Sequence, residues 1–167
     1  MEKSEKIRIL IADDHYAVRM GVAAIINSEP DMEVVAEATD GAEALEFFER
    51  VQPDLALLDV RMPIKDGLKT AMEIRSKFPF ARIIMLTAFE GDDEIYKALQ
   101  AGARGYVFKN AAGEKLIPAL RAVVAGQRWI PQEVTNRLGS RQAFEELTPR
   151  ELQVLHEFGG SIRSCVS

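Results

Sequence analysis

Five short apolar segments alternate with five amphipathic stretches in the first 126 residues of the chain. The apolar segments lie at 7–12, 32–38, 54–59, 82–87 and 105–109. The first, third and fourth are nearly continuous in Ile, Leu, Val, Met and Ala, as expected for strands covered on both faces. Alternation of such strands with helices predicts an α/β fold, with a parallel sheet between two layers of helices.

Between these segments, apolar residues recur at spacings of three, four and seven, which places each set on one face of a helix. The sets are Val18, Val22, Ile25 and Ile26; Leu45 and Phe48; Leu68, Ala71 and Met72; Ile95, Ala98, Leu99 and Gly102; and Leu116, Leu120, Val123 and Val124. Five strands and five helices in alternation predict a doubly wound, five-stranded parallel sheet.

Composition places the chain among globular proteins. Of its 167 residues, 47% are hydrophobic and 28% are charged. No run of about 18 apolar residues could span a membrane, and the N-terminus lacks the apolar core of a signal peptide. The single cysteine, Cys165, excludes an internal disulfide. A cytoplasmic protein without a membrane partner is expected.

The charge balance does not favour binding to nucleic acid. Residues 1–126 carry 16 Lys or Arg and 21 Asp or Glu, and residues 127–167 carry five of each kind. Affinity for DNA depends largely on cationic contacts to phosphate. Neither part of the chain has the excess of positive charge that such binding needs.

Polar residues stand at the ends of four predicted strands. Asp13 and Asp14 follow the first strand, Asp59 ends the third, Thr87 ends the fourth and Lys109 ends the fifth. In open sheets of this kind, ligands bind beyond the carboxyl ends of the strands, where the strand order reverses. With the order 2-1-3-4-5, the first and third strands are neighbours, and their three carboxylates share one crevice.

Each of these residues also has a purely structural interpretation. An Asp between a strand and a helix is most often an N-cap, and this applies to Asp14 as it does to Asp40, Asp66 and Asp92. Thr87 alone is an ordinary strand residue, and Lys109 alone is a solvated charge. Three clustered carboxylates, however, repel one another by about 1 kcal/mol per pair in water, and by more when buried. Such a cluster indicates a cation.

Magnesium is the cation that this chemistry favours, because it binds carboxylates, backbone oxygen and water. With magnesium bound, one carboxylate can attack a phosphoryl group to form an aspartyl phosphate. A lysine ammonium then offsets charge on the transferred group. Asp13, Asp14, Asp59, Lys109 and Thr87 match this set of requirements.

Four motifs carry a resemblance to a known family. They are "ILIADDH", "LLDVRMPIKDG", "MLTAF" and "GARGYVFKN", and they occur in this order at strand ends. They resemble the motifs of the receiver domain of two-component response regulators, and the resemblance covers residues 6–126. It implies a flavodoxin-like fold with strand order 2-1-3-4-5, a sensor histidine kinase as partner and Mg²⁺ as cofactor.

The resemblance also implies a role for each site residue. Asp59 matches the phosphoacceptor, Asp14 a direct magnesium ligand, and Asp13 a ligand that acts directly or through water. The backbone carbonyl of Arg61 matches a further ligand. Lys109 would contact the phosphoryl group.

A conformational switch is implied by the same match. Thr87 would move toward the phosphoryl group, and Tyr106 matches the aromatic residue that then turns inward. Pro63 and Gly67 shape the loop after the phosphoacceptor, and Met62 packs beneath it. An ordinary strand aromatic is the structural alternative for Tyr106.

Beyond residue 126, "VVAGQRWIPQEV" and "LTPRELQVL" resemble the linker and output domain of NarL/FixJ-type regulators, whose output is a LuxR-type helix-turn-helix. The chain thus divides into a receiver at 1–126, a linker with a short helix at 127–146 and a truncated output start at 147–167. Trp129 and Ile130 are expected to pack against the receiver. A capping box at Thr148 and Glu151 predicts a helix over 147–158.

The recognition helix that would enter DNA does not follow, so DNA binding is not expected for this chain, although the parent family regulates transcription. A homodimer, or a heterodimer with a full-length regulator, is expected as a further partner.

Two other functions stay open. A haloacid-dehalogenase-like phosphatase uses an aspartyl nucleophile on a similar sheet, but it places an acid or base two residues later. Arg61 stands there, so the chain is expected not to be an enzyme beyond slow self-dephosphorylation. The other alternative is a module that acts by dimerisation without phosphorylation of Asp59.

Overall fold

The computed structural model describes residues 5–88 and 92–131. Along the chain it has the elements β1 (Ile7–Ala12), α1 (Tyr16–Asn27), β2 (Met32–Ala38), α2 (Gly41–Val51), β3 (Leu55–Asp59), α3 (Gly67–Lys77), β4 (Ile83–Thr87), α4 (Asp92–Gln100), β5 (Gly105–Phe108), a 3-10 turn (Lys109–Ala111) and α5 (Ala112–Val124). All five predicted strands are present, with bounds that differ by at most one residue.

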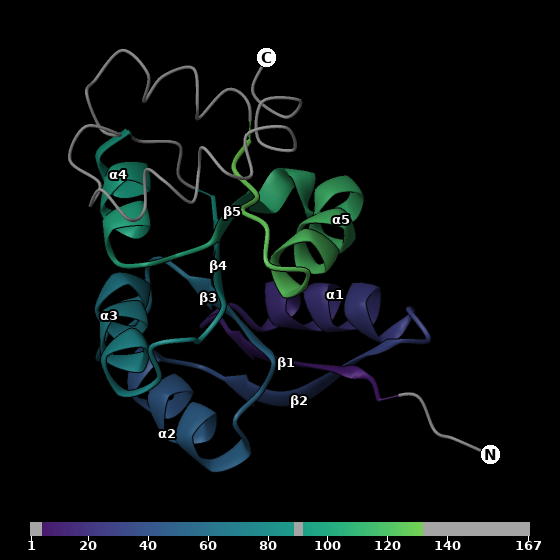
Figure 1. The fold of residues 1–167 in the computed structure, drawn as a ribbon, viewed down its shortest axis with the longest axis horizontal. Coiled ribbons are helices and arrows are strands. Elements are labelled where there is room, and N and C mark those ends of the chain that lie inside the picture. Colours follow the sequence, from purple (N-terminus) through teal and green to yellow (C-terminus); the bar gives the residue numbers. More distant parts are fainter. Residues whose placement is uncertain (1–4, 89–91, 132–167) are drawn as a thin grey trace.

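The five strands form one parallel sheet with the order β2-β1-β3-β4-β5. The predicted fold is therefore confirmed. Helices α1 and α5 cover one face, and α2, α3 and α4 cover the other (Figure 1). Strand β1 lies between β2 and β3 in this order. The chain passes from β1 to β2 on one side and then crosses over to β3 on the other side. The strand order therefore reverses between β1 and β3, and the carboxyl ends of these two strands lie side by side.

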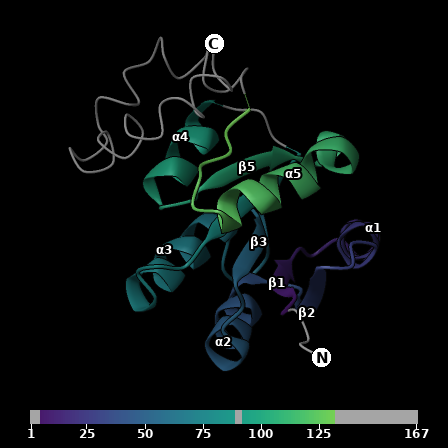
Figure 2. The same cartoon turned by 45° about the vertical axis from the view of Figure 1, so that its right-hand side comes forward.

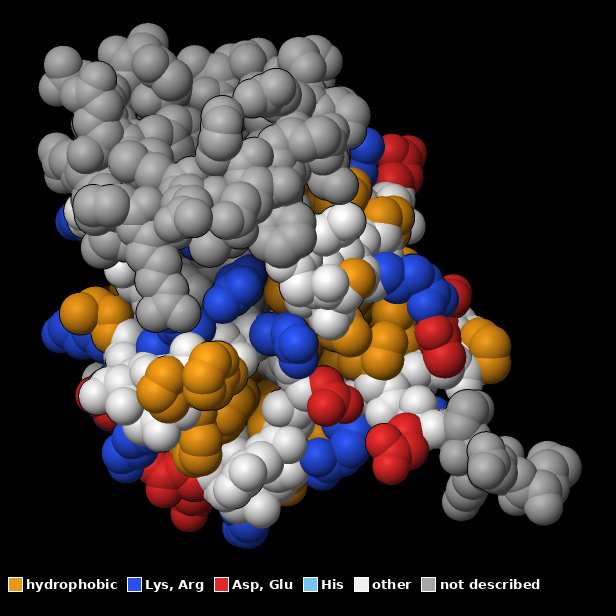
Figure 3. Space-filling view, viewed as in Figure 1, with side chains coloured by type: hydrophobic (Ala, Val, Ile, Leu, Met, Phe, Trp, Pro, Cys, Tyr) orange, Lys and Arg blue, Asp and Glu red, His pale blue; other side chains and the backbone are white. Residues whose placement is uncertain are grey.

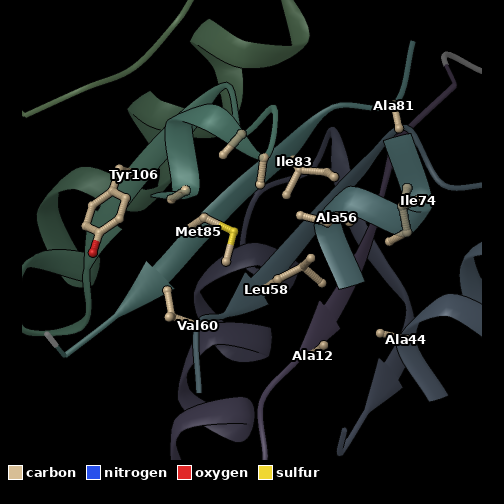
Figure 4. Close-up of a cluster of buried hydrophobic side chains, with 14 of the residues drawn as sticks. Ala12, Ala44, Ala56, Leu58, Val60, Ile74, Ala81, Ile83, Met85 and Tyr106 are labelled. Atoms are coloured by element: carbon tan, nitrogen blue, oxygen red, sulfur yellow. The ribbon is translucent and has the colours of Figure 1, made fainter. Parts of the chain in front are cut away.

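Two hydrophobic clusters hold the layers together, one on each face of the sheet. The cluster under α1 and α5 includes Ile9, Leu57 and Leu116. The cluster under α2, α3 and α4 includes Leu58 and Ile74, and Figure 4 shows its side chains from β3, β4 and α3 meeting between the strands and the helix. Burial of both faces explains why β3 and β4 are apolar up to their last residues, Asp59 and Thr87.

Two details of the predicted helix faces are wrong. Met72 is 58% exposed, because α3 turns Gly67, Thr70, Ala71 and Ile74 toward the sheet and Met72 projects from the other side. Gly102 lies beyond the end of α4, with φ of 97°. The Gly102 and Ala103 amides donate to the carbonyls of Leu99 and Ala98, which closes the helix in the left-handed manner that glycine permits.

The N-caps at Asp40 and Asp66 are confirmed, since their side chains accept from the amides of Glu43 and Lys69 at 2.8 Å. Asp14 is not a cap, because α1 begins after His15, which makes no side-chain capping bond. The acidic side chain of Asp14 is thus available to the strand-end cluster.

A shallow groove lies at the amino ends of the strands, opposite the predicted site. Phe48, Phe78 and Phe80 line it. Phe80 is 87% exposed, and hydrophobic side chains gather beside the connection from α3 to β4 in Figure 3. This groove is separate from the carboxyl ends that hold the polar cluster.

The predicted packing of Trp129 and Ile130 against the receiver is confirmed, since each contacts one of the two clusters. The helix expected over 147–158 and most of the linker expected at 127–146 lie outside the described residues. Within residues 5–88 and 92–131, no helix is long and apolar enough to cross a membrane.

Candidate functional site

The sheet order brings four of the predicted residues to one edge. Asp13 follows β1 and Asp59 ends β3, and these two strands are paired in register. Lys109 follows β5 directly and extends its side chain across to both carboxylates. Its Nζ lies 2.9 Å from Asp13 Oδ2 and 3.3 Å from Asp59 Oδ2. Lys109 therefore links two carboxylates that are 46 positions apart in the sequence.

Burial separates the carboxylates into two kinds. Asp13 and Asp59 are 1% and 4% exposed, whereas the Asp14 side chain is 35% exposed. Asp13 Oδ1 accepts from the backbone amide of His15 at 2.8 Å. His15 Nδ1 lies 3.2 Å from both Asp13 Oδ1 and Asp14 Oδ1. The site thus has a buried floor and an exposed rim.

The donor atoms fit a divalent cation. Ligand atoms of Asp13, Asp14, His15 and Asp59 all lie within 4.8 Å of one another. Asp13 Oδ2 is buried and lies 2.9 Å from the Lys109 ammonium. A cluster of carboxylate oxygens suits a hard ion such as Mg²⁺. The Arg61 carbonyl, the remaining predicted ligand, stays a prediction.

Burial, and after it the negative charge of Asp13, raise the pKa of Asp59 to about 6, although Lys109 acts in the opposite direction. Burial also tends to lower the pKa of Lys109, but its contacts with Asp13 and Asp59 outweigh this, and the pKa lies above its usual value. At neutral pH, Lys109 is therefore charged and Asp59 is mostly an ionised, poorly solvated carboxylate.

The loop from β3 to α3 is held tightly around Asp59. A Cβ at Gly67 would lie 2.0 Å from the Asp59 carbonyl oxygen, so only glycine fits there. Met62 is 9% exposed and belongs to the cluster beneath the loop, as predicted. Ile64 has φ of 68° and is 83% exposed at the loop tip. A β-branched residue rarely adopts this conformation, so the loop is strained beside the site.

Arg61 connects this loop to α4. Its backbone amide lies 3.4 Å from Asp59 Oδ1, a weak contact, and its guanidinium forms an ion pair with Glu94. The positive charge of Arg61 is thus directed to α4. No local pattern in the sequence indicates this pair, because 33 residues separate its members.

The predicted switch residues lie on neighbouring strands next to the cluster. Thr87 is 2% exposed at the end of β4, and it is opposite Phe108 in the register of β4 and β5. Tyr106 is fully buried, two residues earlier on β5, with its ring edge-on to Phe108 at 5.5 Å. Figure 4 shows Tyr106 at the margin of the cluster near Met85 and Val60. The movement of these residues stays a prediction.

The geometry thus brings together Asp13, Asp14, Asp59 and Lys109, with Thr87 at the end of the adjacent strand. His15 contacts both rim and floor carboxylates, a role that sequence reasoning did not assign, although its position directly after two aspartates was a usable signal. An acidic cluster with one lysine can hold a cation and bind a dianionic group between them.

Comparison with known proteins shows the family to which the chain belongs. Residues 9–121 match the family model described as "Response regulator receiver domain". The chain is 37% identical over 164 residues to oxygen regulatory protein NreC of Staphylococcus epidermidis, covering 89% of this chain and 75% of that protein.

Two solved structures are similar over most of their length. A two-component response regulator of the LuxR family from Aurantimonas sp. superimposes with a TM-score of 0.78 at 33% identity, covering 83% of this chain and 99% of that one. The signal receiver domain of the response regulator NarL from Mycobacterium tuberculosis gives a TM-score of 0.70 at 37% identity, covering 74% of this chain and 99% of that one.

Proposed function

The chain belongs to the receiver family of two-component response regulators, in the LuxR/NarL group, and we propose that it receives a phosphoryl group on Asp59 in a magnesium-dependent reaction. One observation carries the proposal: Asp59, buried and with a raised pKa, lies 3.3 Å from Lys109 within an acidic cluster. A structural aspartate has no need of such surroundings, which cost stability unless the site is used.

In the proposed step, a carboxylate oxygen of Asp59 attacks the phosphorus atom of a phosphohistidine on a sensor histidine kinase, or of a small phosphodonor. The bond from phosphorus to nitrogen or oxygen in the donor breaks, and its electron pair leaves with the donor. The imidazole of the kinase then takes a proton from solvent, whereas a carboxylate leaving group such as acetate stays ionised. Asp13, Asp14, Asp59 and the Arg61 carbonyl would hold Mg²⁺, which would supply positive charge to offset that of the phosphoryl oxygens.

The residues of the chain prepare Asp59 for this reaction. Its raised pKa leaves the carboxylate ionised at neutral pH but more basic than an ordinary aspartate, which favours attack on phosphorus. Lys109 is held beside Asp59 by its second contact, to Asp13, and can stay with the phosphoryl oxygens after transfer. Asp13 thus orients Lys109 and shares its positive charge with Asp59.

Phosphorylation would then act on the switch. A new dianion at Asp59 attracts the Thr87 hydroxyl and Lys109, and the space near Thr87 determines where the ring of Tyr106 lies. A sensor histidine kinase is the partner that the family match indicates, and transcription regulation is the role of the parent family. A phosphorylation-independent dimer is the competing proposal.

Turnover of phosphate esters is not proposed. A haloacid-dehalogenase-like phosphatase needs an acid or base at position 61, and here Arg61 forms an ion pair with Glu94. The phosphoaspartate should hydrolyse slowly. Rapid, steady release of phosphate from an ester would require the phosphatase interpretation instead.

The test is the intact mass of the protein after incubation with acetyl phosphate and Mg²⁺. Wild-type protein should gain one phosphoryl group, and Asp59→Asn should gain none. Asp54→Asn is a matched control, since it changes an aspartate at the other end of β3 that accepts from the Arg8 amide. If Asp59→Asn gains a phosphoryl group to the same extent as the wild-type protein, Asp59 is not the acceptor.

A further inference from the structure

Residues 127–131 return along the free edge of the sheet beside β5 (Figure 2). The reversal occurs at the end of α5, where Gly126 has φ of 93°. Gln127 donates its amide to the Ala122 carbonyl at 2.9 Å, and Gly126 donates to Val123 at 3.0 Å. This pair of bonds is the Schellman motif, which turns the chain sharply out of the helix.

Two backbone hydrogen bonds attach this segment to β5. Trp129 donates its amide to the Arg104 carbonyl at 2.9 Å, and its carbonyl accepts from the Tyr106 amide at 2.9 Å. Trp129 is paired in parallel with Gly105 between them. The segment is therefore bonded to the backbone of Tyr106, the residue predicted to move when Asp59 is phosphorylated.

The side chains of the segment contact both faces of the sheet. Trp129 packs against the cluster under α1 and α5. Ile130 packs against the other cluster, whose buried members include Tyr106 and Phe108. Successive residues of an extended segment point to opposite faces, so the segment spans the sheet edge as a strand would. A new position of the Tyr106 ring would rearrange a member of the cluster against which Ile130 packs.

We propose that residues 127–131 act as a coupling strand: the segment docks on β5 more strongly in one arrangement of Thr87 and Tyr106 than in the other, and so transmits the state of Asp59 to the chain beyond residue 131. This inference rests on the proposed function, because phosphorylation of Asp59 selects between the two arrangements. The phosphorylation site at Asp59 and the docking site of residues 127–131 then depend on the same two arrangements of Thr87 and Tyr106. The coupling between these two sites must therefore be reciprocal. A segment that only covers the sheet edge would show no such coupling.

The first test follows the segment directly in the full chain. Trp129 is the only tryptophan, so its fluorescence reports on this segment. Acetyl phosphate and Mg²⁺ are added, and the phosphorylated fraction is measured by intact mass in the same sample. Trp129 emission should change in proportion to that fraction in wild type and stay constant in Asp59→Asn.

The outcomes separate the two proposals. A protein that is phosphorylated on Asp59 while Trp129 emission stays constant overturns the coupling strand and leaves the proposed function intact. A protein that gains no phosphoryl group overturns the proposed function, and the coupling with it.

The second test uses reciprocity. Ile130→Ala removes packing of the segment, and Ile25→Ala is the matched control, because Ile25 is half-buried on α1 and contacts only the other cluster. Affinity for beryllofluoride, a phosphoryl mimic, is measured by calorimetry with saturating Mg²⁺. We expect a change of about fivefold or more in Ile130→Ala and no comparable change in Ile25→Ala.

A smaller change in Ile130→Ala, or an equal change in both variants, overturns the proposal. Unfolding curves confirm that each variant is folded at the assay temperature. If Ile130→Ala unfolds there, Ile130→Val and Ile25→Val replace the pair, and the same comparison of affinities decides.

Discussion

Asp59→Asn should stabilise the protein in the absence of divalent cations. The folded protein holds the Asp59 carboxylate nearly out of water, at 4% exposure, beside the negative charge of Asp13. The ionised form is therefore disfavoured in the folded state, and its pKa rises from 3.8 to about 6. Asparagine has nearly the same shape as aspartate but carries no charge.

The magnitude follows from this shift. A difference of about 2 pKa units corresponds to about 3 kcal/mol, and allowance for solvent at the rim of the site reduces it to about 1 to 3 kcal/mol. Because the pKa of Asp59 is raised on folding, proton binding stabilises the folded protein fully below about pH 4, and this contribution is lost as the pH rises through about 6. The advantage of Asp59→Asn should be largest above about pH 7 and small near pH 4.

Urea unfolding in the presence of a chelator, at several pH values, measures this difference. Asp54→Asn is the control for loss of an aspartate from β3. Added Mg²⁺ should narrow or reverse the difference, since the cation binds the folded wild type. The raised pKa of Asp59 would be refuted if Asp59→Asn were less stable than wild type at neutral pH. It would also be refuted if the difference in unfolding free energy between the two proteins did not vary with pH.

Three further predictions concern the same site. Lys109→Met should destabilise the protein by about 2 to 3 kcal/mol at neutral pH, because Asp13 and Asp59 lose their shared cation; urea unfolding should show a smaller loss near pH 5, where Asp59 takes up a proton. Gly67→Ala should cost more than about 2 kcal/mol, or prevent folding, because its Cβ meets the Asp59 carbonyl at 2.0 Å; an unchanged melting temperature would contradict this. Mg²⁺ should raise the melting temperature of wild type with concentration and should have much less effect on Asp13→Asn; equal shifts in both proteins would show that the ion binds elsewhere.

Local patterns were sufficient for the elements and for most of the site. Continuous apolar runs predicted β3 and β4, because strands buried on both faces exclude polar residues. Parallel strands place their carboxyl ends at one edge, so Asp13, Asp59 and Lys109 could be grouped before any coordinates were known. The error at Met72 arose where one residue at the margin of a helical face decides burial, and the error at Gly102 arose because α4 ends before that residue.

By itself, the sequence determined the order of strands and helices, the composition of the acidic cluster and the family, since these depend on periodicity and motifs that are local in the chain. The tertiary structure decided how deeply Asp59 is buried, which side chain neutralises Arg61, and that Trp129 pairs with the edge of β5. Those features depend on distances between segments far apart in the sequence. Desolvation and charge interactions vary with such distances, and no local pattern specifies them.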